Sequence, residues 1–404
     1  MKNKITDSIF SVGVLNPNVR NADVVVKTSN GTTYNSYVVK GSEKTALIET
    51  VHKDYFDKYL KNVEEISDIN KIDYLVMNHN EPDHSGAIQK LIQLNPKITI
   101  LTSPAGAIYL KNITNNSNLN LKIVKNDEYL DLGNKTLRFI SAPFLHWPDS
   151  MFTWVEEEKT LFTCDFLGCH YCEPYAFDFE ITDKSAFLSS LKTYFDCIFS
   201  PFKKYVTSGI SKIKNLDISF VCPSHGPVLT KDFMLNQVIK TYEQWSNPQK
   251  PKDPLIPIFY CSAYGNTKQI AKAISRGIQN QIPNSKVSLY NVVECDPSDL
   301  CDKLNNSSAF LVGSPTINKD AAAPIWTLLS TIDAINNAKK LAATFGSFGW
   351  SGEAASQIAD RLKSLKLSTF DENFRVCFTP TEKDLENATE FGEKFAKEFL
   401  KNLN

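Results

Sequence analysis

A proline-rich stretch divides this sequence into two parts that follow different patterns. Residues 245–254 read Trp-Ser-Asn-Pro-Gln-Lys-Pro-Lys-Asp-Pro, and proline interrupts both helices and central strands. The chain has 404 residues, whereas a single domain usually has about 150. We therefore expect one domain over residues 1–250 and a second over residues 251–404.

The first part contains short apolar runs typical of strands, with helical patterns at Gly86–Leu94 and Ala186–Cys197. Phe152–Val155 and Thr160–Thr163 flank Glu156–Lys159 in the manner of a hairpin, which indicates antiparallel pairing. These features predict a mixed α/β domain. Its other expected strands are Asp23–Lys27, Ser36–Val39, Thr45–Glu49, Tyr74–Met77, Ile98–Leu101, Leu121–Val124, Thr136–Ile140, Met151–Val155 and Ile218–Cys222.

Strands and helices alternate regularly after the proline-rich stretch. Because such alternation is typical of a parallel sheet covered on both faces, this part predicts a doubly wound α/β domain. The expected strands are Leu255–Tyr260, Val287–Val292, Ala309–Val312, Lys340–Phe345 and Val376–Thr379. The expected helices are Thr267–Gln281, Ala323–Ile335, Ala354–Lys363 and Glu382–Leu400.

Composition excludes several classes of partner. The formal net charge is -1, so there is no electrostatic field to attract nucleic acid or an anionic membrane. No run approaches the roughly 18 apolar residues of a membrane span, and the N-terminus lacks the pattern of a secretory signal. The nine cysteines show no disulfide framework, and Cys169-x-x-Cys172 alone is a weak metal pattern. We expect a cytoplasmic protein with reduced thiols.

The densest group of metal-binding side chains is His79-Asn-Glu-Pro-Asp-His84, which directly follows the expected strand Tyr74–Met77. Histidines and carboxylates make up most of this segment, and carboxylates crowded together repel one another unless a cation is present. Pro82 disfavours a helix, so we expect a turn in which the side chains converge. The segment therefore predicts a metal site just beyond the end of the strand.

Further candidates follow other strands. Loops at strand ends on one edge of a sheet commonly gather to form a site. Any one of these residues alone would fit an ordinary structural role, and His52 is expected at the surface. As a set with the segment above, they favour a metal site. The residues that each follow an expected strand are His146, Asp165 and His225.

Three segments of the second part follow expected strands and are rich in small and hydroxyl residues: 261–267, Gly313–Asn318 and Gly346–Gly352. The first leads into a helix, whose N-terminus favours a phosphate. It has neither the Gly-Lys-Ser/Thr of a P-loop nor a Gly-x-Gly-x-x-Gly turn. Ligands of open α/β sheets bind at the carboxyl ends of the strands, and Phe348 and Trp350 can border a flat ring there.

These motifs resemble those of the flavodiiron proteins. The segment His79–His84, followed by His146, Asp165 and His225, is similar to the metal-binding pattern of the metallo-β-lactamase fold in its flavodiiron version. Hydrolases of that fold carry a second histidine where Glu81 stands, and a carboxylate suits iron better than zinc. The segment 261–267 resembles the phosphate loop of flavodoxins.

The resemblance implies a metallo-β-lactamase-like αββα sandwich followed by a flavodoxin-like doubly wound parallel sheet. It implies that His79, Glu81 and His146 bind one iron, that Asp83, His84 and His225 bind the other, and that Asp165 bridges the two. It places His170 and Tyr194 near the substrate. The residues implied to contact FMN are Ser262, Ala263, Tyr264, Gly265, Asn266, Thr267, Ser314, Pro315, Thr316, Asn318, Ser347, Phe348, Gly349, Trp350, Ser351 and Gly352.

The implied reaction is reduction of O2 to water, of NO to N2O, or of both, with electrons passing through FMN to the two irons. An external donor (rubredoxin, or a flavin or NADH reductase) and a head-to-tail homodimer or homotetramer are also implied. Asp23 stands where related sequences carry a histidine near the iron pocket, so the preference between O2 and NO stays open.

One alternative shares the same fold. A zinc-dependent hydrolase of the metallo-β-lactamase fold, joined to a flavodoxin electron carrier, would place similar ligands at the same strand ends. Glu81 argues against that alternative, and so do the cofactor segments of the second part, which hydrolysis does not need.

Overall fold

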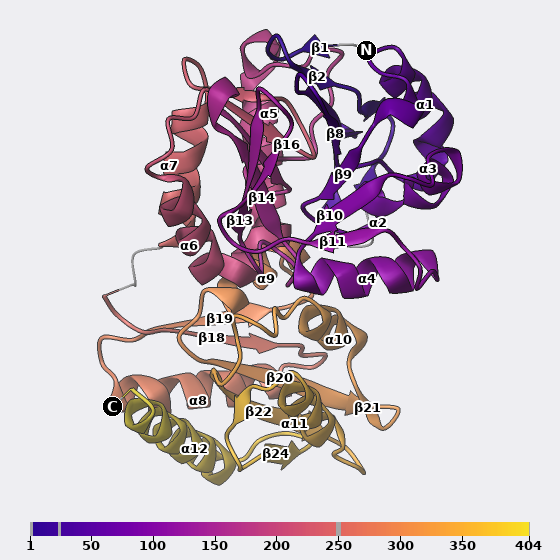
Figure 1. The fold of residues 1–404 in the computed structure, drawn as a ribbon. Helices are drawn as coiled ribbons and strands as arrows, with labels where there is room; N and C mark the ends of the chain where they lie inside the picture. The colour runs from indigo at the N-terminus through magenta and orange to yellow at the C-terminus, as the bar shows by residue number, and fades with distance from the viewer. Residues whose placement is uncertain (1–2, 23–25, 248–251, 404) are drawn as a thin grey trace. The chain divides into compact units, whose positions relative to one another are not determined.

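The computed structural model describes residues 3–22, 26–247 and 252–403. The chain separates into two compact units, residues 1–248 and 249–404 (Figure 1). Asp23 lies outside the described residues, as does most of the expected strand Asp23–Lys27, of which Val26–Lys27 forms β5. Each unit is a mixed α/β structure, as predicted.

Two sheets form the centre of the first unit. The larger has the order β1-β2-β7-β8-β9-β10-β11 and the smaller the order β12-β13-β14-β15-β16-β17. The strands of the larger sheet are β1 (Asn3–Lys4), β2 (Ile9–Ser11), β7 (Tyr37–Lys40), β8 (Thr45–Ile48), β9 (Tyr74–Met77), β10 (Thr99–Thr102) and β11 (Leu121–Ile123). Those of the smaller are β12 (Glu128–Asp131), β13 (Thr136–Ser141), β14 (Met151–Val155), β15 (Thr160–Cys164), β16 (Phe220–Pro223) and β17 (Leu229–Thr230).

Successive residues of the inner strands alternate between two cores. On β8, Ile48 packs with Phe139 and Phe162 of the smaller sheet, while Leu47 packs with Tyr59 under the helices on the other side. Because both faces of these strands are buried, their sequences are continuous apolar runs. The sheets therefore lie face to face between helices, which confirms the predicted αββα sandwich.

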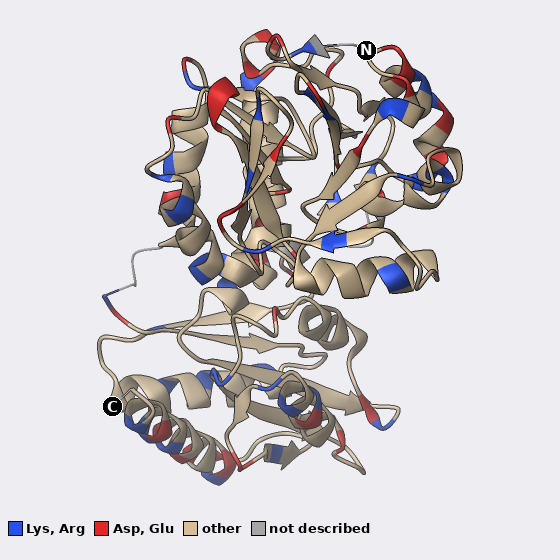
Figure 2. Ribbon diagram, in the orientation of Figure 1, with Lys and Arg blue, Asp and Glu red and all other residues tan. Residues whose placement is uncertain are grey.

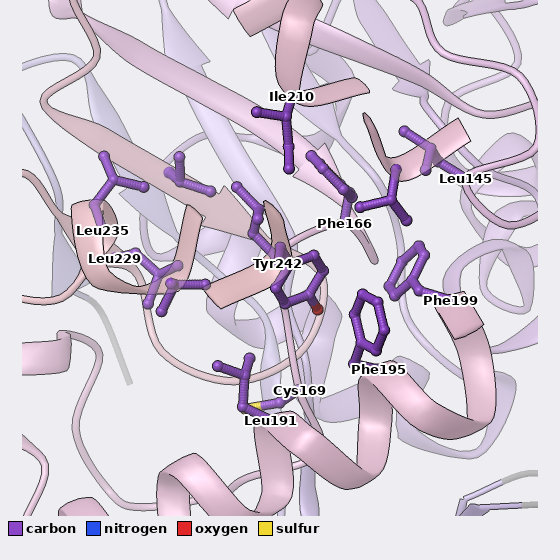
Figure 3. Close-up of a cluster of buried hydrophobic side chains, with 14 of the residues drawn as sticks. Leu145, Phe166, Cys169, Leu191, Phe195, Phe199, Ile210, Leu229, Leu235 and Tyr242 are labelled. Atoms are coloured by element: carbon purple, nitrogen blue, oxygen red, sulfur yellow. The ribbon is translucent and has the colours of Figure 1, made fainter. Parts of the chain in front are cut away.

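Helices cover the outer face of each sheet (Figure 1). The larger sheet is covered by α1 (Phe56–Glu64), α3 (Ile88–Leu94) and α4 (Pro104–Thr114). The smaller is covered by α5 (Lys184–Tyr194), α6 (Lys203–Ile213) and α7 (Leu235–Ser246). Figure 3 shows part of the buried hydrophobic cluster to which these helices contribute Leu191, Ile210 and Tyr242. The expected helix Ala186–Cys197 is α5, which ends at Tyr194 and continues as a π-helix, Phe195–Phe199.

Short strands complete the first unit. β3 (Val14–Asn16) pairs with β6 (Thr32–Tyr34), and β4 (Asn21–Ala22) pairs with β5. The hairpin prediction is confirmed, since β14 and β15 are antiparallel and Lys159 closes their turn in the left-handed conformation. The segments considered below follow the ends of β8, β9, β13, β15 and β16.

The second unit is a doubly wound sheet, as predicted, with the strand order β19-β18-β20-β22-β23. Its strands are β18 (Leu255–Tyr260), β19 (Lys286–Asn291), β20 (Phe310–Ile317), β21 (Asp320–Ala321), β22 (Leu341–Phe348), β23 (Ser368–Thr369) and β24 (Phe374–Cys377). All pairs are parallel except β20 with β21. The helices are α8 (Asn266–Gln281), α9 (Pro297–Asn305), α10 (Ala323–Ser330), α11 (Ala354–Ser364) and α12 (Glu382–Lys401).

Two cofactor segments begin differently from the sequence prediction. β20 continues through Ile317 and β22 through Phe348, so Ser314, Thr316 and Ser347 lie on strands rather than in loops. The register explains this, because Ser314 pairs with Gly346 and Pro315 with Ser347 in the parallel ladder. Small residues such as Ser314 and Gly346 do not end the two strands, because β20 and β22 stay paired through these positions.

Charged side chains are mixed over both units (Figure 2), and the outer face of α12 alternates acidic with basic residues. Among the helices of the described residues, none combines the length and the apolar character needed to cross a membrane.

The helices α8 and α12 touch through their backbones. An added Cβ on Gly277 would lie 2.0 Å from the Thr389 carbonyl oxygen, and one on Gly392 would lie 2.2 Å from the Ile274 carbonyl oxygen. Only hydrogen fits at either position. The close approach lets Phe391 and Phe395 of α12 bury themselves beside α8.

We expect Gly392→Ala to lower the free energy of unfolding by about 1–3 kcal/mol, because the methyl group forces the two helices apart. Helix propensity alone would give the opposite sign, a gain of about 1 kcal/mol. Urea unfolding followed by circular dichroism measures the difference. The exposed α8 substitution Gln279→Ala is the control, and a stabilised Gly392→Ala would show that the contact is not tight.

Candidate functional site

Seven predicted side chains meet at one edge of the two sheets. The segment 79–84 follows β9, His146 follows β13, Asp165 follows β15 and His225 follows β16. Contrary to the prediction of a turn, residues Pro82–Ser85 form one helical turn, α2. Proline is well suited to the first position of a helix, where its missing N–H has no partner to lose.

The first ligand group consists of His79, Glu81 and His146. Glu81 Oε2 lies 3.3 Å from His79 Nε2 and 3.1 Å from His146 Nε2. Asp165 Oδ2 completes the group, at 3.5 Å from His79 Nε2 and 3.4 Å from His146 Nε2. Ligands about 2.1 Å from one metal ion are separated by about 3.0–3.4 Å, so this spacing fits a single ion.

The second ligand group consists of Asp83, His84 and His225. Asp83 places Oδ1 at 3.3 Å from His84 Nε2 and Oδ2 at 3.0 Å from His225 Nε2. Asp165 contributes its other oxygen here, with Oδ1 at 3.1 Å from His84 Nε2 and 3.5 Å from His225 Nε2. Asp165 therefore presents one oxygen to each group, which is the arrangement of a bridging carboxylate.

Several atoms of these groups are buried with no hydrogen-bond partner among the described residues. They include both oxygens of Asp165, Oδ1 of Asp83 and Nε2 of His84. Leaving a buried charge unpaired costs several kcal/mol, so such atoms indicate a ligand that completes them. The buried thiol of Cys164 lies near His84 and Asp165, but burial raises its pKa and disfavours the thiolate that would bind a metal. The remaining donors are oxygen and nitrogen atoms, which fit two iron ions.

The pKa shifts have the same electrostatic origin. Burial lowers the pKa of His84, but the nearby carboxylates of Asp83 and Asp165 outweigh burial and raise this pKa to about 10. Burial raises the pKa of Glu81, yet contacts with His146 and His79 bring it down to about 2. The carboxylates thus generate a field that favours positive charge at this point.

Sequence reasoning missed two buried carboxyl groups beside the ligands. Asp149 is fully buried and contacts His79, and Glu49 is 2% exposed and accepts a hydrogen bond from the Asn78 N–H. Burial raises the pKa of Glu49 to about 8, although nearby His84 opposes the shift. A polar residue next to an apolar strand was the only signal for either residue, and that signal is common in loops.

A cavity of about 450 Å3 opens onto both ligand groups. Tyr34, His52 and Tyr55 form part of its wall, with the Tyr34 and His52 rings stacked at 5.8 Å. His52, which was expected at the surface, is half-buried: its side chain is 32% exposed and lies against Tyr34. The cavity is far larger than a diatomic molecule, so it leaves room for a substrate and ordered water.

His170 and Tyr194 line the same cavity. Their rings are 4.8 Å apart and perpendicular, and the His170 ring lies 4.6 Å from that of His225. His170 Nδ1 lies 2.8 Å from Thr32 Oγ1. Burial, together with the neighbouring His225, lowers the pKa of His170 to about 3, so this imidazole is neutral at pH 7.

Cys169 and Cys172 are not joined and do not form a ligand group with other described residues. Cys169 is buried, and burial raises the pKa of its thiol. A buried neutral thiol is a poor metal ligand and a poor nucleophile.

The phosphate-loop candidate lies where β18 ends and α8 begins. Gly265 adopts φ +89° at the N-cap of α8, and Ser262 Oγ accepts hydrogen bonds from the N–H groups of Gly265 and Lys268 at 3.1 and 3.3 Å. Residues 261–267 contain no carboxylate. A helix N-terminus without nearby negative charge favours a phosphate group, which fits FMN.

The other cofactor segments lie beside this loop. Thr267 Oγ1 and Ser347 Oγ are 2.9 Å apart, which joins the first segment to the third. Tyr264 is 94% exposed and Trp350 is 84% exposed, a rare exposure for such large rings. The Ser314 and Thr316 hydroxyls are engaged within the protein, with the N–H groups of Ala322 and Ala354. Two unpaired rings beside the loop fit a flat isoalloxazine.

The geometry agrees with comparisons to known proteins. A model described as the ODP family of β-lactamases matches residues 32–226, and the flavodoxin model matches residues 258–392. The flavo-diiron protein FprA2 of Clostridium acetobutylicum is 50% identical over 98% of both chains. A nitric oxide reductase of Moorella thermoacetica is 33% identical over 97% of both chains. The rubredoxin oxygen:oxidoreductase of Desulfovibrio gigas has a TM-score of 0.75 and 28% identity, over all of both chains.

The fold and the two ligand groups define an oxidoreductase with a diiron site in a metallo-β-lactamase-like unit and FMN in a flavodoxin-like unit. The chain belongs to the flavodiiron protein family.

Fe(II) is expected to stabilise the protein through Asp165. An ion present at about 100 times its dissociation constant adds about 2.7 kcal/mol to the free energy of unfolding. We expect Asp165→Asn to lose most of this gain, because the amide cannot bridge two cations as a carboxylate does. Anaerobic urea unfolding with and without Fe(II) measures the effect, and a circular dichroism spectrum equal to that of the wild type shows that the variant is folded. A gain equal to that of the wild type would exclude Asp165 as a shared ligand.

Proposed function

We propose that this protein reduces O2 to water, NO to N2O, or both, at the two ligand groups joined by Asp165. The observation that carries the proposal is one carboxylate offering Oδ2 to the first group and Oδ1 to the second. Such an arrangement holds two ions close enough to act on one small molecule. The named relatives include both a nitric oxide reductase and an oxygen oxidoreductase.

The cofactors would supply the electrons for the reaction, and the protein would hold the cofactors in place. When bound, two ferrous ions and reduced FMN supply the electrons for either reaction. The first group would hold one ion and the second group the other, while Asp165 would bridge them. The carboxylates would offset the charge of the ions, and the histidines would bind through Nε2. The ligand groups line the cavity, so a substrate there could reach the ions.

The tautomer of two histidines favours this ligand assignment. His79 Nδ1 faces a carboxylate oxygen of Asp149, and His225 Nδ1 lies 2.6 Å from the Thr33 carbonyl oxygen. Both oxygens only accept, so each Nδ1 carries the hydrogen. Each Nε2 is thereby left with its lone pair directed toward the ligand groups.

His170 and Tyr194 are proposed to act on the substrate. Both reactions consume protons together with electrons, and a neutral imidazole and a phenol can each donate a hydrogen bond to an oxygen atom. Burial keeps the phenol protonated, since it raises the pKa of Tyr194. Their place in the cavity wall beside His225 supports this role.

FMN is proposed to bind at the loop 261–267 and the ends of β20 and β22. The α8 N-terminus would hold its phosphate, and Tyr264 and Trp350 would flank its ring. The segments proposed to contact it are Ser262–Thr267, Ser314–Asn318 and Ser347–Gly352. We also propose that the two domains are bounded near residue 250.

An external donor and a second copy of the chain complete the proposal. The rubredoxin oxygen:oxidoreductase of Desulfovibrio gigas supports rubredoxin as the donor, and a flavin or NADH reductase is the other candidate. Family membership supports a head-to-tail homodimer, or a tetramer of such dimers, and a cytoplasmic location. A zinc hydrolase is not favoured, because a carboxylate, Glu81, takes part in the first group.

We expect His84→Asn and Asp165→Ala to abolish consumption of both O2 and NO while FMN stays bound. Each removes a ligand that no neighbour replaces. The measurement is anaerobic stopped-flow, in which reduced protein is mixed with O2 and with NO in turn, and the two wild-type rates rank the substrates. Metal analysis accompanies it. The exposed substitution Asp217→Asn is the control, and unchanged turnover in either ligand variant, or zinc in place of iron, would refute the proposal.

Tyr194→Phe is expected to lower kcat about 100-fold or more with iron and FMN content unchanged, because only a hydrogen-bond donor is removed. Steady-state oxidation of an artificial reductant by O2 and by NO measures kcat and KM separately. Tyr129→Phe, at a side chain 57% exposed, serves as the matched control. A kcat equal to that of the wild type for both substrates would show that the hydroxyl takes no part.

A further inference from the structure

Asp149 is the most heavily engaged carboxylate beside the ligand groups. It is fully buried, and its Oδ1 lies 3.1 Å from His79 Nδ1. Its Oδ2 accepts hydrogen bonds from the Asn80 backbone N–H and from the Asn80 side-chain amide, both at 2.8 Å. Three donors around one buried carboxylate satisfy it fully, so this ion is stable without a metal partner.

These contacts join the two segments that supply the first ligand group. His79 and Glu81 belong to the segment after β9, whereas His146 belongs to the segment between β13 and β14 that also carries Asp149. The Met151 N–H donates to the Asn78 carbonyl oxygen at 3.0 Å and extends the same junction. Asp149 therefore sits at the point where the first group is assembled from distant parts of the chain.

Among the described residues, no carboxylate is hydrogen-bonded to the Nδ1 of a histidine of the second ligand group. The buried carboxyl of Glu49 lies near His84, but its hydrogen bond is to the Asn78 N–H. His225 Nδ1 faces neutral oxygens, the Thr33 carbonyl at 2.6 Å and Thr32 Oγ1 at 3.3 Å. His84 Nδ1 is buried with no hydrogen-bond partner among the described residues. A carboxylate behind a histidine makes its imidazole a stronger donor than a neutral oxygen does, and it also fixes the ring orientation.

We propose that Asp149 is a positioning residue that preassembles the first ligand group and makes it bind Fe(II) more tightly than the second. This inference rests on the proposed ligand groups. Asp149 acts in two ways: its charge strengthens His79 as a donor, and its bonds to Asn80 hold the segment that carries Glu81. The two metal positions are consequently unequal, and the first fills before the second.

The test is an anaerobic Fe(II) titration of the metal-free, FMN-loaded protein against a competing chelator. The wild type is expected to bind two ions in two steps of different affinity. Asp149→Asn keeps the shape of the side chain but removes its charge, and we expect it to weaken the tighter step about 10–100-fold and leave the weaker step unchanged. Mössbauer spectra at one equivalent of iron are expected to lose the signal that dominates in the wild type.

Four further variants and two measurements support the comparison. His146→Ala should remove the tighter step and His225→Ala the weaker one, which assigns each step to a group. Asp57→Asn, at an exposed position of α1, is the charge-matched control. FMN content and the urea midpoint show whether each variant is folded, and Asp149→Ser provides the same comparison if Asp149→Asn does not fold.

The outcomes separate this inference from the proposed function. A wild type that binds fewer than two irons contradicts the ligand groups themselves. A wild type with two irons and an unchanged tighter step in Asp149→Asn overturns only the role of Asp149. Equal weakening of both steps, or loss of the tighter step in His225→Ala, also overturns it, since Asp149 would then act through the fold as a whole.

Discussion

The shared carboxylate of Asp165 is the constraint on which the first unit depends. Its two oxygens face opposite ligand groups, and neither has a hydrogen-bond partner among the described residues. Burying such a charge is costly unless cations complete it. The rest of the unit keeps this residue in place: Phe166, the next residue along the chain, is fully buried and stacks on Phe152 at 5.5 Å. The site is thus anchored in the core that Figure 3 shows.

The sandwich explains why the ligands can come from so many parts of the sequence. Strands of both sheets end at one edge. Successive residues of these strands are buried on opposite faces of the sheet, so the strand ends from which the loops begin are rigid. Rigid strand ends hold the polar side chains of each ligand group at spacings that fit one ion. Asp149 and the Thr33 carbonyl then orient the histidines from behind. The proposed metal ligands are thus held from behind by residues that contact their Nδ1 atoms.

The proposed cofactor site of the second unit is formed by strand-end segments and a helix N-terminus rather than by charged side chains. Parallel strands bring three segments to one end of the sheet, and the proposed phosphate site is the N-terminus of α8, where residues 261–267 contain no lysine or arginine. The two units match two separate family models, the ODP β-lactamase model and the flavodoxin model. Membership in that family rests on identity over nearly the whole chain, and the ligand geometry is independent of it.

The sequence by itself determined the two-part organisation, most strands and all seven ligand candidates, because apolar periodicity and ligand-rich turns are local patterns. The helices α1, α4, α6, α7 and α9 were not predicted, since their burial depends on sheets formed by distant residues. Pro82 starts a helical turn, and His52 packs on Tyr34, for reasons that only neighbouring elements supply. The tertiary structure alone decided that Asp165 faces both groups and that Asp149 supports His79. Most of those contacts join residues far apart in the chain, such as His79 and Asp149 at 70 positions, and no local pattern encodes them.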